Sequence, residues 1–592
     1  MFTLIILTKQ MNIIIFYLNK ENILIKILSK SVREYKKYAI MAPLFIAIEV
    51  AMEAIIPFLM ALIIDNGIYK NDMQYIYKMS ILIIGAALLS LTAAIIQSKA
   101  AAVASAGFAK NLRHDVFVKI QRFSFNNVNK FSSASLITRM TTDIQRIQQS
   151  FQMLIRICFR APLMFIFSII MVSSIQYKMT IVFAIAIPIL LCVISFMLKK
   201  ALPLIYKLFK YYDKINSVVD ENLLGIKTIK AYVREDEEIS KFSEASGNIR
   251  KYNIKVEKIL ILTNPIMMSV TFICILALSY LGALLIVDGQ MQVGNLMSIF
   301  TYTMQILFAL MMIGMIIAML TMSKASADRV VEVLTTDLDM DLNPNGIKEV
   351  KDGSIEFKDV CFKYSDESSL YCLNNINFKV SSGETIGVLG STASGKTTLV
   401  SLIARLYDAK CGTVKVAGRN VKDYDIKALR DSVSVVLQKN QLFKGTVRSN
   451  MKWGNENASD EEIFAALKKA NADFITDLDA TVTQEGNNFS GGQKQRLCIA
   501  RALLKNPKIV IFDDSTSAVD TKTDSLIRSA LKDIDATKII ISQRVQSVSD
   551  ADKIIILENG EINDFNTPDS LLQTNEIYKD LVEVQLGGKT NE

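Results

Sequence analysis

The stretch Gly390–Thr398, GSTASGKTT, decides how the second half of this chain folds. It contains the pattern GxxxxGK[ST] and follows a short apolar run, ETIGVLG, that predicts a buried strand. Glycines let consecutive backbone N–H groups turn toward phosphate oxygens, and the start of a helix adds partial positive charge. We therefore predict a strand, a phosphate-binding loop and a helix, with Lys396 reaching the β- and γ-phosphates and Thr397 placing its hydroxyl on Mg²⁺.

Two further motifs lie downstream of this loop. The apolar run KIVIFDD predicts a strand that brings Asp513 to the edge of the sheet beside the phosphate loop, where its carboxylate can hold Mg²⁺ through water. Before it, NFSGGQKQR at 488–496 predicts backbone amides exposed at the start of a helix. A common turn with a helix cap is the alternative interpretation of that motif, and the strand that follows argues against it.

The first half of the chain is dominated by apolar stretches. Six of them are long enough to cross about 30 Å of hydrocarbon: they lie near 39–64, 77–103, 152–175, 179–199, 258–287 and 294–320. The connections at 104–151 and 200–257 are long and rich in Lys and Arg, whereas the others are short. By the positive-inside rule we expect the long connections and both termini to be cytoplasmic.

The N-terminal segment precedes these spans. Residues 1–18 are apolar but interrupted by Lys9 and Gln10, with neither a basic start nor a cleavage site, which makes a poor signal peptide. Met11 is an alternative start. The stretch NILIKILSKSVREY at 22–35 has apolar residues at helical spacing, which predicts a helix in the membrane interface or a plain cytoplasmic amphipathic helix.

The bulk composition agrees with a membrane half joined to a second half of another kind. At 592 residues the chain is too long for one core, hydrophobic residues make up 51%, and the mean hydropathy is +0.30. The net charge of +9 is spread along the chain, which favours membrane orientation over nucleic-acid binding. The seven cysteines show no metal-ligand spacing, so we expect reduced, structural thiols.

Polar residues inside the spans are candidates for function. Glu49 and Glu53 lie four apart on one face of the first span, so both could line a substrate cavity. Arg156 and Arg160 in the third span could simply extend to the cytoplasmic interface. The last span is rich in methionine, which suits a wall that accepts varied apolar ligands, or ordinary helix packing.

With these motifs the chain resembles a half-size ABC exporter of the bacterial multidrug type. The resemblance covers nearly all of the chain beyond about residue 20. It implies an all-α six-helix transmembrane domain of the type I exporter fold, followed by an α/β P-loop NTPase cassette with a helical subdomain. The implied divisions are an N-terminal segment with an elbow helix at 1–36, a transmembrane domain with two long cytoplasmic helical extensions at 37–322, a linker at 323–352 and the cassette at 353–592.

The resemblance also implies roles for individual residues. Tyr364 would stack on adenine, and Gln438 would link the γ-phosphate and Mg²⁺ to the membrane domain. The implied ATP-binding set is Tyr364, Gly390, Ser391, Thr392, Ala393, Ser394, Gly395, Lys396, Thr397, Thr398, Gln438 and Asp513, of which Thr397, Gln438 and Asp513 hold Mg²⁺. The signature for the partner's ATP is Phe489 (in place of leucine), Ser490, Gly491, Gly492 and Gln493; the cassette–cassette loop contains Ser517 and Asp520. The segments 132–144 and 221–235 look like the coupling regions that dock on cassettes.

Two positions depart from the family's pattern. Asp514 stands where the family has its catalytic glutamate, and Gln543 stands where it has its switch histidine; the only histidine, His114, lies in the membrane half. The shorter side chain withdraws the carboxylate by roughly 1 to 1.5 Å, and a misplacement near 1 Å can cost on the order of 100-fold. A neutral glutamine cannot offer positive charge, and losing a positioned donor typically costs about 100- to 1,000-fold. We expect ATP binding to survive and hydrolysis at this chain's own site to be weak.

These departures lead to a hypothesis of function. We expect the subunit that carries the degenerate nucleotide site of a heterodimeric exporter, paired with a second half-transporter that has the glutamate and the histidine. It would export a hydrophobic or amphipathic drug, lipid or peptide from a bacterial plasma membrane by alternating access, with a lean toward lipophilic cations. The alternatives are a homodimeric exporter with slow hydrolysis and an ATP-gated regulatory or channel-like protein; an importer is disfavoured because the membrane and cassette halves are fused in this order.

Overall fold

The computed structural model describes residue 24 and residues 26–365, 368–514, 529, 532 and 534–586. The chain divides into two compact units: Met1–Gln121 with Ala134–Thr336, and Arg122–Ser133 with Asp337–Glu592. We call the first the helical unit and the second the cassette unit.

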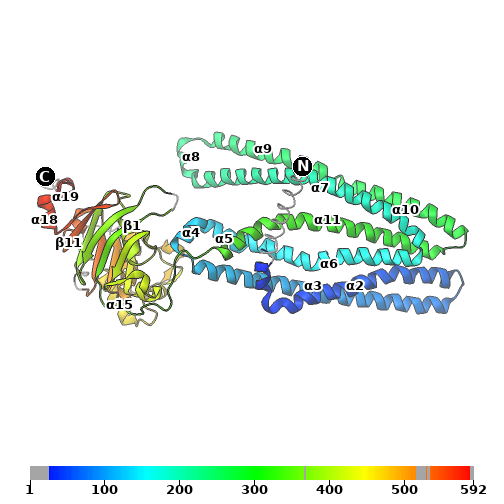
Figure 1. Ribbon diagram of the computed structural model, residues 1–592, viewed down its shortest axis with the longest axis horizontal. Helices are drawn as coiled ribbons and strands as arrows, with labels where there is room; N and C mark the ends of the chain where they lie inside the picture. Colours follow the sequence, from blue (N-terminus) through cyan, green and yellow to red (C-terminus); the bar gives the residue numbers. More distant parts are fainter. Residues whose placement is uncertain are drawn as a thin grey trace, which may run out of the picture. The chain divides into compact units, whose positions relative to one another are not determined.

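The helical unit consists of long helices that run side by side (Figure 1). Their bounds are η1 Lys30–Tyr35, α2 Lys36–Leu62, η2 Ile63–Ile68, α3 Met73–Gln121, α5 Ser133–Thr138, η3 Arg139–Asp143, α6 Ile144–Ile175, η4 Tyr177–Met179, α7 Thr180–Leu224, α8 Ile226–Tyr232, α9 Glu235–Leu260, α10 Thr263–Val287 and α11 Val293–Thr335.

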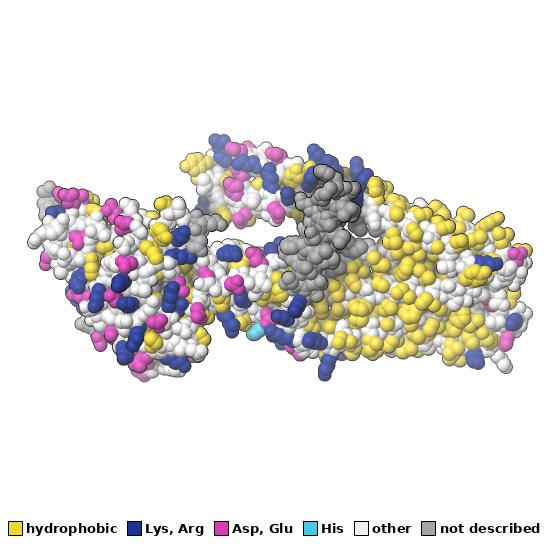
Figure 2. Space-filling model, in the orientation of Figure 1, with side chains coloured by type: hydrophobic (Ala, Val, Ile, Leu, Met, Phe, Trp, Pro, Cys, Tyr) yellow, Lys and Arg dark blue, Asp and Glu magenta, His cyan; other side chains and the backbone are white. Residues whose placement is uncertain are grey.

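The six predicted membrane spans are confirmed. Within the described residues, six helical segments are long and apolar enough to cross a membrane: Lys26–Ile68, Met73–Gln121, Ser133–Ile175, Tyr177–Leu224, Glu235–Val287 and Val293–Gly314. Several helices continue well beyond the apolar stretches; α3 runs on to Gln121, and α11 continues to Thr335 through the first part of the expected linker. Hydrophobic side chains cover the right-hand part of this unit, whereas charged side chains gather over α8 and α9 (Figure 2).

Small residues let the first helices approach closely. Ala42 of α2, Ala100 and Ala104 of α3 and Ile155 of α6 are buried in one cluster. In a membrane, where lipid competes for apolar contacts, close packing of small side chains is a main source of helix association. By contrast, Ile81 and its neighbours on α3 are exposed in the unit, as expected for a face that meets lipid.

The cassette unit contains three sheets within its described residues. Its elements are α4 Phe125–Phe131, β1 Ile355–Phe362, β2 Leu373–Val380, β3 Thr385–Gly390, α12 Lys396–Ile403, β4 Cys411–Val416, β5 Arg419–Asn420, η5 Val421–Asp423, α13 Ile426–Ser432, β6 Val433–Val436, β7 Gly445–Thr446, α14 Val447–Met451, α15 Asp460–Lys469, β8 Thr481–Val482, η6 Gln484–Gly486, α16 Gly491–Leu504, β9 Ile509–Asp513, β10 Thr537–Ile541, η7 Val545–Ser547, β11 Lys553–Glu558, β12 Glu561–Asn566, α18 Pro568–Thr574 and α19 Glu576–Leu586.

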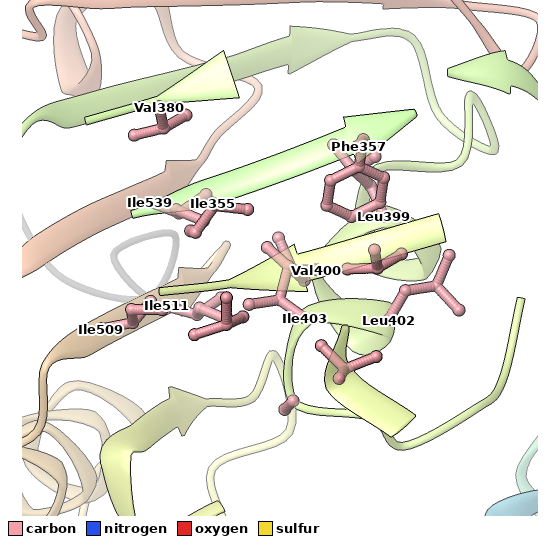
Figure 3. Close-up of a cluster of buried hydrophobic side chains, with 14 of the residues drawn as sticks. Ile355, Phe357, Val380, Leu399, Val400, Leu402, Ile403, Ile509, Ile511 and Ile539 are labelled. Atoms are coloured by element: carbon pink, nitrogen blue, oxygen red, sulfur yellow. The ribbon is translucent and has the colours of Figure 1, made fainter. Parts of the chain in front are cut away.

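The main sheet has the order β12-β11-β3-β10-β9-β6, and every pair except β11 with β12 is parallel. A second sheet, β2-β1-β4-β5, is antiparallel, and β7 pairs with β8. Leu399 and Ile403 of α12 pack with Phe357 of β1 and Ile511 of β9 in one buried cluster (Figure 3). The α/β cassette fold predicted for this half is therefore confirmed, and its core holds α12 and the loop before it.

The predicted first coupling segment, 132–144, is wrong in position. The segment that belongs to the cassette unit is Arg122–Ser133, which includes α4. Asn129 donates a hydrogen bond to the Tyr407 hydroxyl at 3.3 Å, and the ring of Phe125 lies 5.9 Å from that of Tyr407. Arg139, inside the predicted segment, instead pairs with Glu332 of α11 in the helical unit at 2.9 Å.

One prediction about the cysteines is also wrong. Cys361 and Cys411 are joined by a disulfide bond between β1 and β4, where a uniformly reduced set was expected. No spacing motif indicated this pair, because 50 residues separate the two positions and only the register of the sheet brings them together. The free cysteines are Cys158, Cys192, Cys274, Cys372 and Cys498.

Candidate nucleotide-binding site

A cavity of about 320 Å³ lies where β3, β9 and β10 end in the cassette unit. Ile541 of β10 stands between Val388 of β3 and Asp513 of β9 in register, so the loops after these strands meet at one edge. Its lining residues are Tyr364, Cys372, Thr392, Ala393, Ser394, Gly395, Lys396, Thr397, Thr398, Gln438, Asp513, Asp514, Ile541 and Gln543. The structure thus brings together most of the residues predicted to bind ATP, as well as the two that depart from the expected pattern.

The loop between β3 and α12 has the geometry of a phosphate cradle. Gly395 adopts φ +101°, and a Cβ there would lie 2.8 Å from the carbonyl oxygen of Cys372, so only glycine fits. α12 begins at the next residue, and the N–H groups of its first turn have no intrahelical acceptor. They are therefore available to an anion at the helix start.

Lys396 is held at the base of this loop. Its Nζ donates to the carbonyl oxygens of Gly390 at 2.9 Å and Ser391 at 2.6 Å. Burial lowers the pKa of Lys396, and the carboxylates of Asp514 and Asp513 act in the opposite direction. The hydrogen bonds of this buried ammonium group go to neutral loop oxygens, and two aspartates lie nearby. The group is therefore suited to pairing with phosphate oxygens.

Thr397 and Asp513 form a pair of oxygen ligands that fits Mg²⁺. The Thr397 hydroxyl donates to Asp513 Oδ1 at 3.0 Å, and Asp513 is buried at the end of β9. The described residues contain no cluster of three or more His, Cys, Asp or Glu side chains that could cage a metal by themselves. Mg²⁺ commonly takes only one or two protein oxygens and completes its shell with water and phosphate, so Thr397 and Asp513 would hold it and the ion would neutralise phosphate charge.

The two adjacent carboxylates differ in environment. Burial raises the pKa of Asp513, and the neighbouring charge of Asp514 raises it further. Burial also raises the pKa of Asp514, while a hydrogen bond from the Gln438 side chain and the charges of Lys396 and Arg544 oppose that rise. Asp514 adopts φ +48°, a left-handed conformation that aspartate tolerates better than most residues. The cavity therefore has a carboxylate at the expected catalytic position, tied to Gln438.

Tyr364 also lines the cavity. Its hydroxyl is 2.9 Å from Thr398 Oγ1, and its ring meets the rings of Phe362 and Tyr407 edge-on at 5.0 and 5.3 Å. These contacts hold the tyrosine ring beside Thr398, the last residue of the phosphate-loop motif. Its part in adenine stacking stays a prediction.

The signature motif caps a helix, a geometry that both the predicted motif and its alternative, a common turn with a helix cap, would produce. The N–H of Gln493 donates to Ser490 Oγ at 3.3 Å and the N–H of Ser490 donates to Gln493 Oε1 at 2.9 Å, which closes a capping box at the start of α16. Phe489 packs against the core of the helical subdomain and the Phe474 ring, 6.3 Å away. The aromatic residue therefore fills an apolar site in place of the family's leucine.

A residue that sequence reasoning missed supports the loop of Gln543. The side chain of Gln585, on α19, donates from Nε2 to the Gln543 carbonyl at 2.9 Å and accepts from the Val545 N–H at 2.8 Å. A single amide thus clamps the backbone on both sides of Arg544. No sequence signal indicated it, because Gln585 lies 42 residues beyond Gln543 in an exposed helix.

Comparisons with known proteins agree with this architecture. The family described as the ABC transporter transmembrane region matches residues 39–311, and the family described as ABC transporter matches residues 373–517. The Bacillus subtilis protein YfiB, an uncharacterized ABC transporter ATP-binding protein, is 36% identical over 95% of this chain and 100% of its own length. The chain belongs to the ABC transporter family. A Mycobacterium tuberculosis protein of the same description is 32% identical, over 93% of this chain and 96% of its own.

The fold of this ABC transporter is also found in a solved structure. A bacterial Atm1-family ABC exporter with ATP bound has a TM-score of 0.80 and 22% identity, over 93% of this chain and 99% of its own. At this identity the likeness shows the fold alone. Membership of the family identifies the cassette as an ABC ATPase domain, which implies ATP binding. It also identifies the protein, with its six apolar helical segments in the described residues, as a membrane transporter.

Some predicted residues cannot be placed in this transporter. Ser517 and Asp520 of the cassette–cassette loop lie outside the described residues. The remaining signature residues, Gly491 and Gly492, begin α16 and are not among the residues that line the cavity; their role toward a partner's nucleotide stays a prediction.

The polar residues of the membrane spans form an ion cluster. Arg160 of α6 bonds to Glu49 Oε1 and to both oxygens of Glu53 at 2.8 and 2.9 Å. The interpretation that Arg160 merely extends to the interface is therefore wrong, since two glutamates hold it. A cavity of about 600 Å³ lies beside the cluster, and Arg160 lines it while Glu49 and Glu53 do not. Its lining residues are Ile46, Gln97, Gln149, Gln152, Met153, Arg156, Ile157, Arg160, Met312 and Met319.

Proposed function

We propose that this ABC transporter is the half of a heterodimeric exporter whose own nucleotide site binds ATP firmly and hydrolyses it poorly. One observation carries the proposal: Asp514 and Gln543 line the same cavity as the phosphate loop, Tyr364 and Asp513. The residues that this chain would contribute to Mg–ATP binding therefore lie together, while the two groups that would activate water and stabilise the γ-phosphate are replaced by weaker ones.

The signature helix supplies the reason for a partner. In this family each ATP lies between one cassette's phosphate loop and the other cassette's signature. The capped start of α16 can complete a competent site on a partner that has the glutamate and the histidine. ATP retained at this chain's own site would hold the two cassettes together while the partner's site turns over. A homodimer would carry the weak site twice.

The membrane cavity favours an amphipathic cargo. Met312, Met319 and Ile157 offer apolar surface, and Arg156 with the glutamine amides offers hydrogen-bond donors. The expected lean toward lipophilic cations loses support, because Glu49 and Glu53 are paired with Arg160. We propose a hydrophobic or amphipathic cargo whose polar group accepts hydrogen bonds, exported by alternating access from a bacterial plasma membrane with the cassette and both termini in the cytoplasm.

A vesicle experiment tests this function. Inside-out vesicles would contain this chain together with a half-transporter that has glutamate and histidine at the positions of Asp514 and Gln543. Such a half-transporter would be sought first in neighbouring reading frames. We expect ATP-driven uptake of a fluorescent amphipathic dye to need both chains, to stop when the partner's glutamate becomes glutamine, and to persist in the Asp514→Asn variant. Equal uptake by vesicles that contain only this chain would contradict the heterodimer and favour a slow homodimer. No uptake against a gradient by either preparation would contradict export.

A further inference from the structure

We propose that Cys361 and Cys411 form a reversible redox site that sets the nucleotide affinity of this cassette. The two residues pair directly across β1 and β4, with Cα atoms 5.0 Å apart, and they are joined by a disulfide bond. Cys361 is half-buried and Cys411 is exposed, so small thiols and disulfides can reach the bond. The inference rests on two parts of the proposed function: the cassette lies in the cytoplasm, and nucleotide binds in its cavity.

The surroundings favour exchange over a permanent bond. Cytoplasmic disulfides are rare because thiols there are kept reduced, and an exposed one is open to reduction. Lys410 directly precedes Cys411, and Lys363 follows Cys361 by two residues. Positive charge near a cysteine favours its thiolate, which is the form that attacks a disulfide.

The backbone keeps the two sulfur atoms together in either state. The N–H of Lys410 donates to the carbonyl of Cys361 at 3.0 Å, beside the pair. Gly412 at φ +73° lies so close to the Asp359 carbonyl that a Cβ would not fit. These contacts do not depend on the disulfide, so the thiols of the reduced form remain neighbours and the bond can form again.

The chemistry is thiol–disulfide exchange with a low-molecular-weight disulfide, RSSR. The thiolate of one cysteine attacks a sulfur of RSSR, which gives a mixed disulfide and releases one thiolate, RS⁻. The thiolate of the second cysteine then attacks the protein sulfur of the mixed disulfide and expels the second RS⁻. In sum, two protein thiols lose two protons and two electrons and RSSR becomes two RSH; an excess of RSH reverses both steps.

The disulfide brackets the aromatic cluster beside the nucleotide cavity. Tyr364 lies three residues after Cys361, and Tyr407 lies four residues before Cys411. The two tyrosine rings meet edge-on at 5.3 Å, and Phe362 contacts both, at 5.0 and 5.4 Å. The bond therefore ties together the two chain segments that position the ring predicted to stack on adenine.

The consequence is a change in nucleotide affinity. The strand contacts at Cys361 and Lys410 persist in both forms, so oxidation acts on the freedom that remains in the two segments toward Tyr364 and Tyr407. The oxidised form orders these residues in advance, whereas in the reduced form nucleotide binding must order them. Ordering one or two side chains corresponds to a change of about three- to tenfold in affinity, with the oxidised form tighter. Because Tyr364 is placed to contact the base, the factor should be the same for ATP and ADP.

The experiment uses the full-length protein in detergent. One portion is reduced with dithiothreitol and the other is oxidised with glutathione disulfide, free thiols are alkylated, and peptides are mapped by mass spectrometry. Dissociation constants for fluorescent ATP and ADP analogues are measured on both portions. We expect a Cys361–Cys411 linked peptide only after oxidation, and both nucleotides to bind about three- to tenfold more tightly to that form.

Two variants serve as controls. Cys361→Ser with Cys411→Ser should bind with one affinity under both conditions, while Cys192→Ser, which removes a free exposed thiol of the helical unit, should keep the redox response. The comparison of reduced and oxidised wild type needs neither variant to fold. Alkylation of both cysteines after oxidation would overturn the proposal, as would measurable affinities that differ by less than twofold. Absence of nucleotide binding in both states would instead overturn the proposed function.

Discussion

Replacing Asp514 by glutamate together with Gln543 by histidine is expected to raise ATP hydrolysis at this chain's own phosphate loop by at least about 100-fold. The longer carboxylate moves toward the attacking water, and the imidazole adds a stronger donor for the γ-phosphate. Both residues already line the cavity with Lys396 and Asp513, so no other part of the site needs rebuilding. Release of ADP in a single-turnover assay of the purified variant measures the effect.

Two controls make this result interpretable. Adding Lys396→Ala to the double variant should remove the gain, because the lysine that reaches the phosphates is lost. Binding of a non-hydrolysable ATP analogue must be checked as well, since Asp514 adopts φ +48° and glutamate tolerates this backbone conformation less well than aspartate. If the double variant binds ATP like the wild type and hydrolysis does not rise, the degenerate-site explanation is wrong.

The second large effect concerns the ion cluster of the membrane spans. Arg160→Ala is expected to destabilise the protein by about 3 to 5 kcal/mol, the usual cost of removing one partner from a buried ion pair. Glu49 is only 5% exposed, and its Oε2 has no hydrogen-bond partner in the described structure, so the loss of Arg160 leaves this carboxylate buried and uncompensated. The midpoint of thermal unfolding in detergent should fall by roughly 5 to 10 °C.

The same helix offers a matched control. Arg156 lies one turn before Arg160 and lines the same cavity, but no ion pair of the described residues includes it. Arg156→Ala should therefore shift the midpoint by only a small fraction of that amount. Adding Glu49→Gln and Glu53→Gln to Arg160→Ala should recover at least half of the loss, because neutral amides cost less to bury than carboxylates. Equal shifts for the two arginine variants would contradict the cluster's role.

The features that could be predicted from sequence are those written in contiguous residues. Six apolar stretches indicated six helices, and the run from β3 through α12 followed from a single motif. Hydropathy detects only the part of a helix that meets lipid, so it did not give the end of α3 at Gln121, although long helical extensions were expected in these connections. The position of the segment that joins the cassette unit, Arg122–Ser133, was missed because α4 has 7 residues, too few for the spacing of its apolar side chains to indicate a helix.

Pairings between distant positions could not be predicted. Glu49 and Glu53 were identified by their spacing, but their partner Arg160 lies 111 residues from Glu49, and only helix packing brings them together. Cys361 and Cys411 meet through the register of an antiparallel pair that contains bulges, which no pattern in the chain specifies. Gln585 likewise reaches Gln543 only because α19 packs back against the main sheet of the cassette unit.

The central claim is that this chain holds ATP well but hydrolyses it poorly with its own residues. The most direct measurement is single-turnover hydrolysis by the purified chain, free of any other half-transporter, compared with its Asp514→Asn variant. We predict that both proteins bind ATP with similar affinity and form ADP at the same slow rate. Rapid ADP formation by the wild type that is abolished in Asp514→Asn would contradict the account.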